Sequence, residues 1–569
     1  MPGKQCYAAV MKHSLLALAI ALLPSPAWST TVVNNVNGIQ VGADGKLQRF
    51  SGLVIGDDGK IVQVIPEGVM MKLGGIDTVV DGGGRTLLPG QIDAHGHLMG
   101  LGQSAMMLDL VGTASLADLQ ARLRDYAAAR PADPWIVGRG WNQELWPDKR
   151  FPMAADLDAV VADRPVILER VDGHAVVVNS AALKAAGVTA ATKDPTGGEI
   201  ERDAAGKPTG LLIDSATELV ASKVPPPTPA QLDQALAKAQ EALLAVGITG
   251  VADMGTSVEA WNAYRRAGEA GRLQVRIMGY ASDVEAMRAM VPSGPTDWIY
   301  GDLLRLGGIK IYGDGALGSR GAWLKRPYAD KPDTSGLRFL TDAELRAKVD
   351  EAAKIGIQPA IHAIGDAANA QAIAAYEWLG QRYPGDRRWR IEHVQVVDPV
   401  DIPRIGKAGI IASMQPVHQT SDRTMAEARL GPDRLAGAYA WQSMVKAGAK
   451  LAFGSDFPVE SPNPFPGLAA AISRQDLQGQ PPGGWIPAER LTFEQALNAF
   501  TRDAAFAGYA EGKIGALEPG KWADFILVDR DPTAGSPQDL AKTQVLETWV
   551  AGKRVWSRAT PAAKGERGR

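Results

Sequence analysis

The middle of the chain alternates short apolar runs with longer amphipathic segments. Apolar runs typical of buried β-strands recur at residues 87–92, 248–252, 275–280, 308–311, 358–361, 389–391, 410–414 and 451–453. Alanine-rich amphipathic segments, such as 229–246, 343–355 and 366–382, separate most of these runs and predict helices. Strands that alternate with helices predict an α/β fold with a parallel sheet, and eight such units match the number in a (β/α)8 TIM-like barrel. We expect this barrel to span residues 90–513.

The segments before and after this middle region show the pattern of β-strands instead. Residues 30–89 show short apolar runs punctuated by glycine-rich turns, including 57–59 and 82–84. Residues 514–558 show the same pattern, with apolar runs at 521–528 and 545–555. Two strand-rich ends that flank a long α/β middle predict one small β-sandwich domain assembled from 30–89 and 514–558.

An insertion is expected inside the barrel. The distance between the first and second apolar runs is far greater than one helix can occupy. We therefore predict an α+β subdomain at about 112–230, placed after the first barrel strand. The stiff segment Pro225-Pro226-Pro227 closes it.

The N-terminus carries a different signal. Lys12 and His13 precede an apolar run at 15–23, and prolines and small residues follow up to Ser29. This pattern predicts a secretory signal peptide over 1–29, too short to span a membrane as a mature helix, and hence export, with the periplasm as the destination. The alternative is a buried N-terminal helix. No other stretch of the sequence reaches 18 consecutive apolar residues.

Charge and cysteine content narrow the possible partners. The 569 residues carry a net charge of -3 and no basic tail, which argues against nucleic acid or anionic lipid as a partner and leaves a small-molecule substrate. The single cysteine, Cys6, lies inside the predicted signal. The mature chain would therefore have no cysteine nucleophile and no thiolate metal site. The sequence makes no prediction of the oligomeric state.

Histidines gather where the predicted strands end. The chain has seven histidines, and five of them lie at or just after an apolar run: His95, His97, His362, His393 and His418. The ends of barrel strands converge on one face, so these imidazoles are expected to lie close together. His95 and His97 are two apart on a strand, which directs both to the same side. Asp456 adds a carboxylate after the last run, and this mixture of donors suits a divalent metal such as zinc.

Other hydrolytic and nucleotide chemistries find no support. The sequence has no Gly-x-Ser-x-Gly elbow and no phosphate-binding loop that ends in Lys-Ser or Lys-Thr. No His-Glu-x-x-His helix surrounds Glu392-His393, which argues against a zincin-like protease.

Three segments carry a resemblance to a known family. They are Pro-Gly-Gln-Ile-Asp-Ala-His-Gly-His at 89–97, Lys-Ile-Tyr-Gly-Asp-Gly-Ala-Leu-Gly-Ser-Arg at 310–320 and Gly-Ser-Asp-Phe-Pro at 454–458. Their order and spacing resemble the amidohydrolase superfamily of metal-dependent hydrolases, in the branch that contains YtcJ-like proteins and N-substituted formamide deformylases. The resemblance covers nearly the whole chain after the signal.

The resemblance implies a centre with two zinc ions. His95, His97 and Asp456 would hold the more buried metal, and His362 and His393 the second. Lys310 matches the position at which related enzymes carry a carboxylated lysine that bridges the two ions. The alternative is an unmodified Lys310, paired with Asp314 or Asp456 in a site with one metal.

The resemblance also implies roles around the metal. A metal lowers the pKa of a bound water, and Asp456 would take the proton and pass it to the departing amine. His418 would donate a hydrogen bond to the substrate or its oxyanion. His174, Trp141 and Arg320 are expected to contact the substrate. Their alternatives are a loop hydrogen bond for His174, packing for Trp141 and bracing of a loop for Arg320.

Three functions remain in competition. The first is hydrolysis of a non-peptide C–N bond in a small amide or N-substituted formamide. The second keeps the metal site but cleaves a lactone, carbamate or phosphoester, because the same chemistry serves all of these. The third is a non-catalytic binding protein, which the complete set of metal-binding residues argues against.

Overall fold

The computed structural model describes residues 30–69, 77–171, 173–195 and 198–559, and an eight-stranded parallel sheet forms its centre. The strands are β7 (Gln91–Gly96), β14 (Ile248–Thr256), β15 (Arg276–Ala281), β16 (Leu304–Tyr312), β17 (Gln358–Ala363), β18 (Arg390–His393), β19 (Ile411–Met414) and β20 (Lys450–Phe453). They pair in chain order from β7 to β20. The backbone N–H of Asp456 donates to the carbonyl oxygen of His95 at 2.7 Å, which joins the two ends of the sheet. The α/β barrel predicted from the alternation is therefore confirmed.

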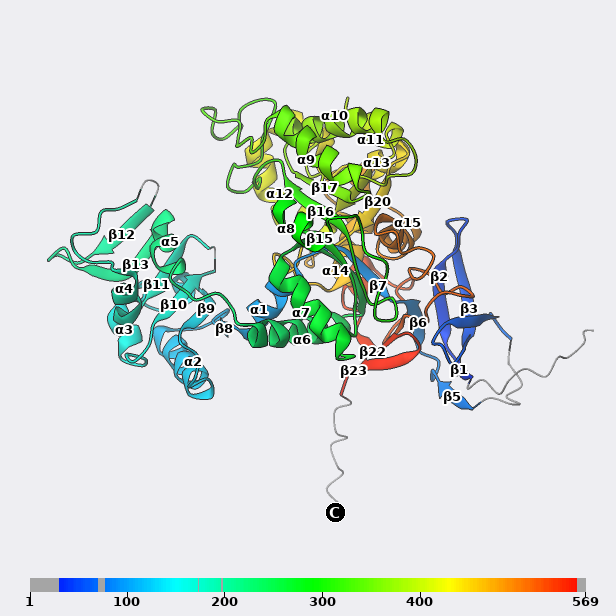
Figure 1. Cartoon of the computed structure of the whole chain (residues 1–569), viewed down its shortest axis with the longest axis horizontal. Helices are drawn as coiled ribbons and strands as arrows, with labels where there is room; N and C mark the ends of the chain where they lie inside the picture. Colours follow the sequence, from blue (N-terminus) through cyan, green and yellow to red (C-terminus); the bar gives the residue numbers. More distant parts are fainter. Residues whose placement is uncertain (1–29, 70–76, 172, 196–197, 560–569) are drawn as a thin grey trace, which may run out of the picture.

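Helices cover the outside of this sheet (Figure 1). They include α6 (Pro229–Ala245), α7 (Val258–Glu269), α9 (Asp342–Lys354) and α10 (Asp366–Arg382). Helix α6 starts where the sequence favours a start: Thr228 caps the helix, Gln231 returns the hydrogen bond, and Pro229 occupies the first turn. Leu232, Leu236 and Leu243 recur at helical spacing and are buried, so one face of α6 packs on the barrel.

The first apolar run divides between two sheets. Residues 87–92 were expected to form one barrel strand, but β6 (Thr86–Pro89) pairs outside the barrel and β7 begins only at Gln91. Gly90 lies at the crossing, where a Cβ atom would stand 2.2 Å from Thr249 Oγ1. Both strands are buried along their whole length, Gln91 included, so no exposed position marks the division.

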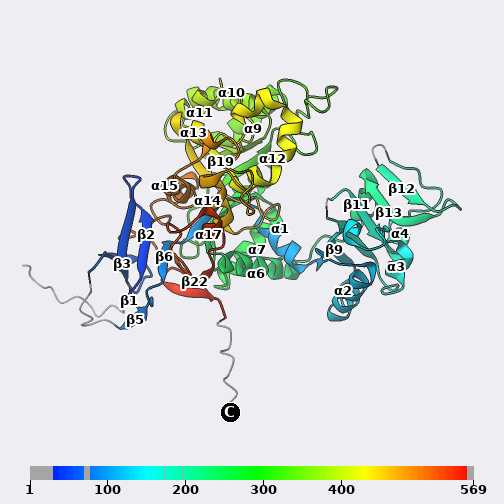
Figure 2. The same cartoon turned by 180° about the vertical axis from the view of Figure 1, so that it is seen from behind.

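The first and last strands of the described residues share one nine-stranded sheet. Its strands are β1 (Thr31–Asn34), β2 (Asn37–Val41), β3 (Leu47–Ile55), β4 (Ile61–Pro66), β5 (Thr78–Asp81), β6, β21 (Phe525–Val528), β22 (Val545–Val550) and β23 (Lys553–Ser557). The pairing of β6 with β21 joins the N-terminal strands to the C-terminal strands. Phe50, Leu87 and Phe525 belong to one apolar cluster, so both ends contribute to the same core. Figure 2 shows β22 and β6 next to the barrel and β1 to β3 farther out.

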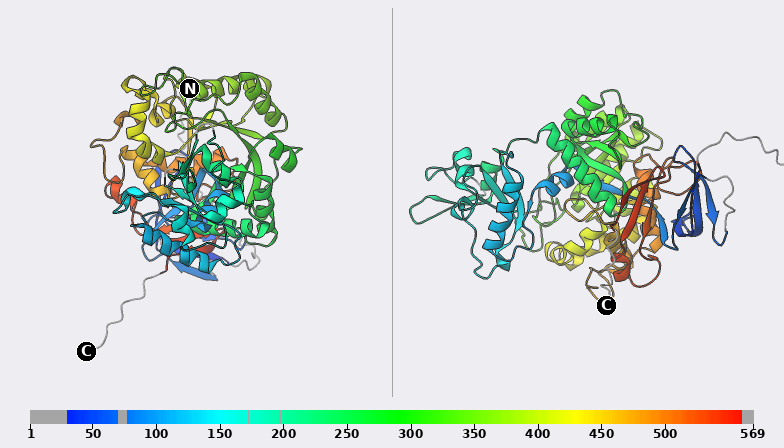
Figure 3. Two further views of the ribbon diagram at one scale, coloured as in Figure 1. Left: turned by 90° about the vertical axis from the view of Figure 1, so that its left-hand side faces the viewer. Right: turned by 90° about the horizontal axis from the view of Figure 1, so that it is seen from below.

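The insertion forms a separate lobe (Figure 3). Its six strands are β8 (Leu108–Asp109), β9 (Ile136–Trp141), β10 (Val166–Arg170), β11 (Ala175–Val178), β12 (Gly198–Arg202) and β13 (Pro208–Asp214), in the order β12-β13-β11-β10-β9-β8. Helices α2 (Leu116–Ala129), α3 (Ala154–Asp158) and α4 (Ser180–Ala186) accompany this sheet. Trp141, Trp146 and Leu168 pack in its own apolar core. The chain leaves the barrel through α1 (Leu98–Met106) and returns at α6.

The predicted signal peptide lies outside the described residues, as does Cys6. Within the part of the chain that the structure describes, no helix combines the length and the hydrophobicity that a membrane crossing requires.

Candidate metal centre

The end of β7 supplies two imidazoles to the mouth of the barrel. His95 is fully buried, whereas the side chain of His97 remains 31% exposed. His95 lies in β7 and His97 directly follows it, and their ring centroids are 5.5 Å apart. A Cβ atom on Gly96 would stand 2.3 Å from the Phe457 ring, so only glycine fits between the two histidines.

Asp456 faces both of these histidines. Its Oδ1 lies 3.0 Å from Nε2 of His97 and 3.4 Å from Nε2 of His95. The residue has φ 61°, a conformation that costs a non-glycine residue about 1–3 kcal/mol and that must be held by its surroundings. The neighbouring Ser455 helps to fix this backbone conformation, because its hydroxyl donates to Oδ2 of the buried Asp93 at 2.6 Å.

Two further imidazoles come from later strands. His362 is the second-last residue of β17 and His393 the last residue of β18. Their ring centroids are 4.4 Å apart, and the His393 ring lies 4.7 Å from that of His95. Nε2 of His362 is buried and has no hydrogen-bond partner among the described residues. Nδ1 of His393 pairs with Oε1 of Gln415 at 2.9 Å, which leaves Nε2 of the same ring able to coordinate a metal.

Burial keeps these imidazoles neutral. Together with the nearby charge of Lys310, it lowers the pKa of His95 to about 4 and that of His362 to about 3. Burial also holds the pKa of His393 well below its usual range. Neutral imidazoles keep the lone pair that a metal requires, so near neutral pH these side chains can act as ligands without losing a proton.

Lys310 lies in the middle of this group. Its Nζ is buried and 3.2 Å from Nε2 of His95. Among the described residues it makes no ion pair with a carboxylate, so the alternative pairing with Asp314 or Asp456 is not seen at contact distance. Asp314 instead accepts backbone hydrogen bonds from Trp323, Ile364 and Gly365 at 2.8–3.0 Å and ties two loops together.

Glu392 is a site residue that the histidine pattern did not single out. Its Oε2 lies 2.6 Å from Nδ1 of His95, and its Oε1 accepts from Nε of Arg390 at 2.8 Å, with all three side chains buried. A carboxylate on the far nitrogen of a ligating imidazole fixes the tautomer and the orientation of the ring. Consecutive strand residues ordinarily point to opposite faces, but φ 74° at His393 lets both Glu392 and His393 contact His95. The only signal in the sequence is a charged pair, Arg390 and Glu392, in an otherwise buried strand.

His418 joins the same cavity from α12 (Pro416–Leu430). Its Nε2 is 3.9 Å from Oδ2 of Asp456 and has no hydrogen-bond partner among the described residues. Its Nδ1 lies 3.2 Å from Nε2 of Gln395, which fixes the ring. The imidazole of His418 therefore faces Asp456 but is not among the residues expected to bind the metal.

The three expected substrate contacts lie elsewhere. Trp141 is fully buried in the core of the insertion, where its indole N–H donates to the Leu168 carbonyl at 2.7 Å. His174, also in the insertion, pairs with Asp214 at 2.8 Å. Arg320 pairs with Asp330 at 2.9 Å. In this conformation the structure does not bring these three side chains together with the histidines, because each already has a local partner.

The converging atoms fit a divalent metal. His95, His393 and Asp456 each offer one ligand atom, and these atoms lie within 4.8 Å of one another. Imidazole nitrogens and a carboxylate are borderline donors that suit zinc and similar ions. The buried Nε2 of His362, which accepts no hydrogen bond from any described residue and lies 3.6 Å from Oδ1 of Asp314, also fits, because a buried polar atom without a hydrogen bond is costly.

The sequence model of the amidohydrolase family matches residues 78–556. The chain belongs to this family. Three relatives share much of its length: Protein LONG AFTER FAR-RED 3 of Arabidopsis thaliana (34% identical, 94% of this chain, 93% of the relative), putative amidohydrolase YtcJ of Bacillus subtilis (strain 168) (33%, 84% and 90%), and N-substituted formamide deformylase of Arthrobacter pascens (29%, 83% and 89%). A resemblance expected from three sequence segments is thus confirmed over most of the chain.

A solved structure extends the similarity to the fold. The crystal structure of an uncharacterized metal-dependent hydrolase from Pyrococcus horikoshii OT3 is 30% identical and has a TM-score of 0.75, over 90% of this chain and 99% of that one. Membership of the amidohydrolase family and the group of metal-binding side chains together identify a metal-dependent hydrolase.

Proposed function

We propose that the protein hydrolyses a non-peptide C–N bond, in an amide or N-substituted formamide of a small molecule. The convergence of His95, His393 and Asp456 at the mouth of the barrel carries the proposal. The similarity to an N-substituted formamide deformylase, at 29% identity, supports this choice of bond over the lactone, carbamate and phosphoester alternatives.

The metal would be held in two adjoining places. His95, His97 and Asp456 would hold one ion, and His362 and His393 a second, with zinc as the ion that this donor set favours. When bound, the metal supplies Lewis acidity, which makes water more acidic and polarises a carbonyl group. Glu392 holds the imidazole of His95 in place for this purpose.

The side chains of the protein move the proton. Burial raises the pKa of Asp456, but the electrostatic interaction with His95 and the hydrogen bond from His97 outweigh it and hold that pKa well below its usual range. The ionised carboxylate can therefore accept a proton from the attacking water and return it to the amine that departs. His418, with its Nε2 3.9 Å from Asp456, would donate a hydrogen bond to the carbonyl oxygen as negative charge develops there.

Carboxylation of Lys310 would complete the centre. Burial lowers the pKa of Lys310 to about 8, so a share of the neutral amine exists near neutral pH and can react with carbon dioxide. The product is an anionic ligand with two oxygens, whereas an ammonium ion would repel a metal.

We expect protein incubated with ¹³C-bicarbonate and zinc to show a carbamate resonance by NMR. Lys310→Ala should abolish it and exposed Lys354→Ala should keep it; persistence in Lys310→Ala would refute the bridge.

A substrate panel tests the proposed bond. N-formyl amines, N-acyl amino acids, lactones and phosphotriesters are supplied to the purified, zinc-loaded protein. We expect turnover of the formamides or amides, with kcat/KM well above that for the esters. Preferential turnover of lactones or phosphotriesters would overturn the choice of bond. Ligand binding without turnover of any of them would favour a binding protein.

We also propose that the protein acts outside the cytoplasm. The charged, apolar and small-residue order of 1–29 supports export. N-terminal sequencing of protein from the periplasmic fraction should begin after about residue 29, and an uncleaved N-terminus in the cytoplasmic fraction would contradict this.

A further inference from the structure

We propose that a cavity beside His97 binds the apolar substituent on the nitrogen of the substrate. The cavity holds about 330 Å³ and lies where β7 and β14 end, next to α1 and the start of α6. His97 itself forms part of its lining. The inference rests on the proposed function, because it assigns the part of the substrate that leaves as an amine.

The walls of the cavity are mainly apolar. Met99 and Gln103 come from α1, Met254 from the end of β14, and Leu232 from α6. Pro226 and Pro227, in the segment that returns from the insertion, form another part of the wall, and polar groups come from Asp253, Ser257, Glu259 and Tyr264. Pockets that bind small molecules typically combine a mainly apolar wall with polar groups that orient the ligand, and this volume lies within their usual range of about 300–1,000 Å³. The flexible methionines suit a hydrocarbon of variable shape.

Hydrogen bonds hold these walls in place. Oδ1 of the buried Asp253 accepts from the backbone N–H of Leu98 at 2.7 Å, which ties the start of α1 to β14. Oδ2 of Asp253 accepts from the hydroxyl groups of Tyr264 and Thr256 at 2.9 and 2.6 Å. The proline segment is stiff as well. The cavity is therefore formed before a ligand arrives, which reduces the ordering that binding requires.

The position of His97 links the cavity to the reaction. The imidazole that lines the cavity also lies 3.0 Å from Asp456 through its Nε2. A hydrocarbon group in the cavity would thus be attached to an amide within reach of the metal-binding side chains. At Gly255, φ is 103° and a Cβ atom would meet nothing within 4 Å, so the end of β14 leaves open space there.

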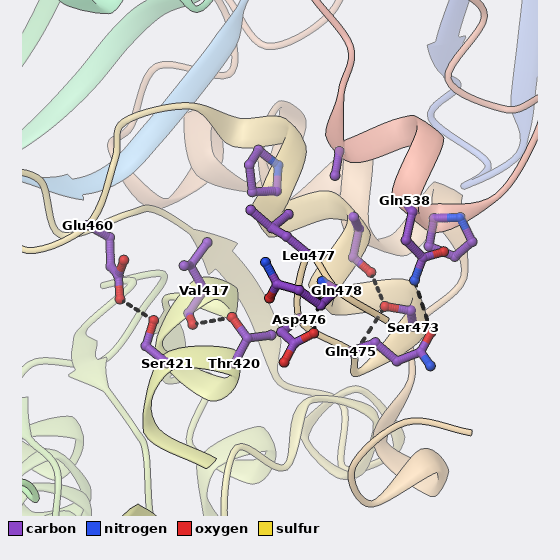
Figure 4. Close-up of a pocket in the computed structure, with 14 residues that line it drawn as sticks. Val417, Thr420, Ser421, Glu460, Ser473, Gln475, Asp476, Leu477, Gln478 and Gln538 are labelled. Carbon is purple, nitrogen blue, oxygen red and sulfur yellow. Dashed lines mark hydrogen bonds between the residues drawn. The ribbon is translucent and has the colours of Figure 1, made fainter. Parts of the chain in front are cut away.

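A second cavity of similar size lacks this connection. It holds about 340 Å³ between α12, α14 (Pro464–Ser473) and α17 (Pro537–Ala541), and polar groups cover much of its wall (Figure 4). Ser421 donates to Glu460 across one side at 2.7 Å. None of the described metal-binding side chains lines it. Leu477, which lines this second cavity, therefore provides a control position for substitutions in the first.

Selectivity between two formamides tests the inference. N-benzylformamide presents a hydrocarbon that would fill the cavity, whereas N-methylformamide does not. Met99→Trp or Gln103→Phe, each on a half-buried position of α1, should lower the ratio of kcat/KM for benzyl over methyl at least about tenfold, by filling the space. The matched control is Leu477→Trp in the second cavity, which should leave the ratio within about twofold. An unchanged ratio in both α1 variants would overturn the inference while leaving the proposed function intact.

A binding measurement covers the case in which neither formamide is hydrolysed. Benzylamine, the expected product, is titrated into the zinc-loaded protein and followed by ligand-observed NMR. Wild type and Leu477→Trp should bind it, and both α1 variants should bind at least about tenfold more weakly. Equal binding by all four proteins, or none by wild type, would overturn the assignment of the cavity.

Discussion

Asp456→Asn should lower kcat for the best formamide or amide substrate by about 10²–10⁴-fold. The amide that replaces the carboxylate is nearly the same size, but it cannot accept the proton of the attacking water. It also weakens the attraction for a cation at the point where His95 and His97 face Asp456, 3.4 and 3.0 Å away. The rate is measured at saturating substrate and zinc, and the bound metal is determined on the same sample.

The matched control is Asp57→Asn, which makes the same chemical change at an exposed turn between β3 and β4. It should leave kcat unchanged. Circular dichroism should show the same fold for both variants, because Asp456 lies in a loop and its replacement keeps the volume. A variant at Asp456 that retains more than about a tenth of the wild-type kcat would show that another group accepts the proton.

Glu392→Gln should lower the free energy of unfolding of the metal-free protein by about 3–5 kcal/mol. The change leaves the guanidinium of Arg390 buried without its charged partner, at a site where both side chains are fully buried. It also removes the carboxylate that orients His95, so we expect zinc to bind about 10–100-fold more weakly. Urea unfolding and competition with a chelator measure the two effects.

The pH dependence of this contribution has a definite sign. Burial raises the pKa of Glu392, but the charge on Arg390 and the hydrogen bond from His95 hold it well below its usual range. A depressed pKa stabilises the folded state above the pKa of the unfolded chain, about 4.3. The difference between wild type and Glu392→Gln should therefore be constant above about pH 5 and should shrink as the pH falls through the folded pKa.

A surface pair supplies the control for this change. Glu377 pairs with Arg404 at 2.6 Å, but both side chains are more than a third exposed. Glu377→Gln should therefore cost less than about 1 kcal/mol. Equal losses in the two variants would mean that the buried pair has no special role in the barrel.

Much of the fold could be predicted because the barrel strands are buried on both faces. Such strands are continuous apolar runs, and the eight runs predicted from the sequence correspond to β7 and to β14 to β20. The division at Gly90 could not be predicted in this way. Strands β6 and β7 belong to different sheets, yet both are fully buried, so their residues read as one run.

The candidate site was predictable where its chemistry depends on rare residue types. Histidines at strand ends pointed to His95, His97, His362 and His393, which the structure brings together. The contact of Glu392 with His95 depends on the unusual φ of His393, and no residue type in the sequence predicts that angle. Trp141 was expected to contact substrate, but whether an aromatic residue faces a core or a cleft depends on the packing of the insertion.

Removal and return of the metal tests the central claim most directly. The protein is stripped with a chelator, zinc is added back in steps, and turnover of the best substrate on the panel is recorded against bound zinc. We expect no turnover in the stripped protein and full recovery at two bound ions, with the side chains of His95, His97, His362, His393 and Asp456 as the ligands. Turnover that survives complete removal of the metal would contradict the account.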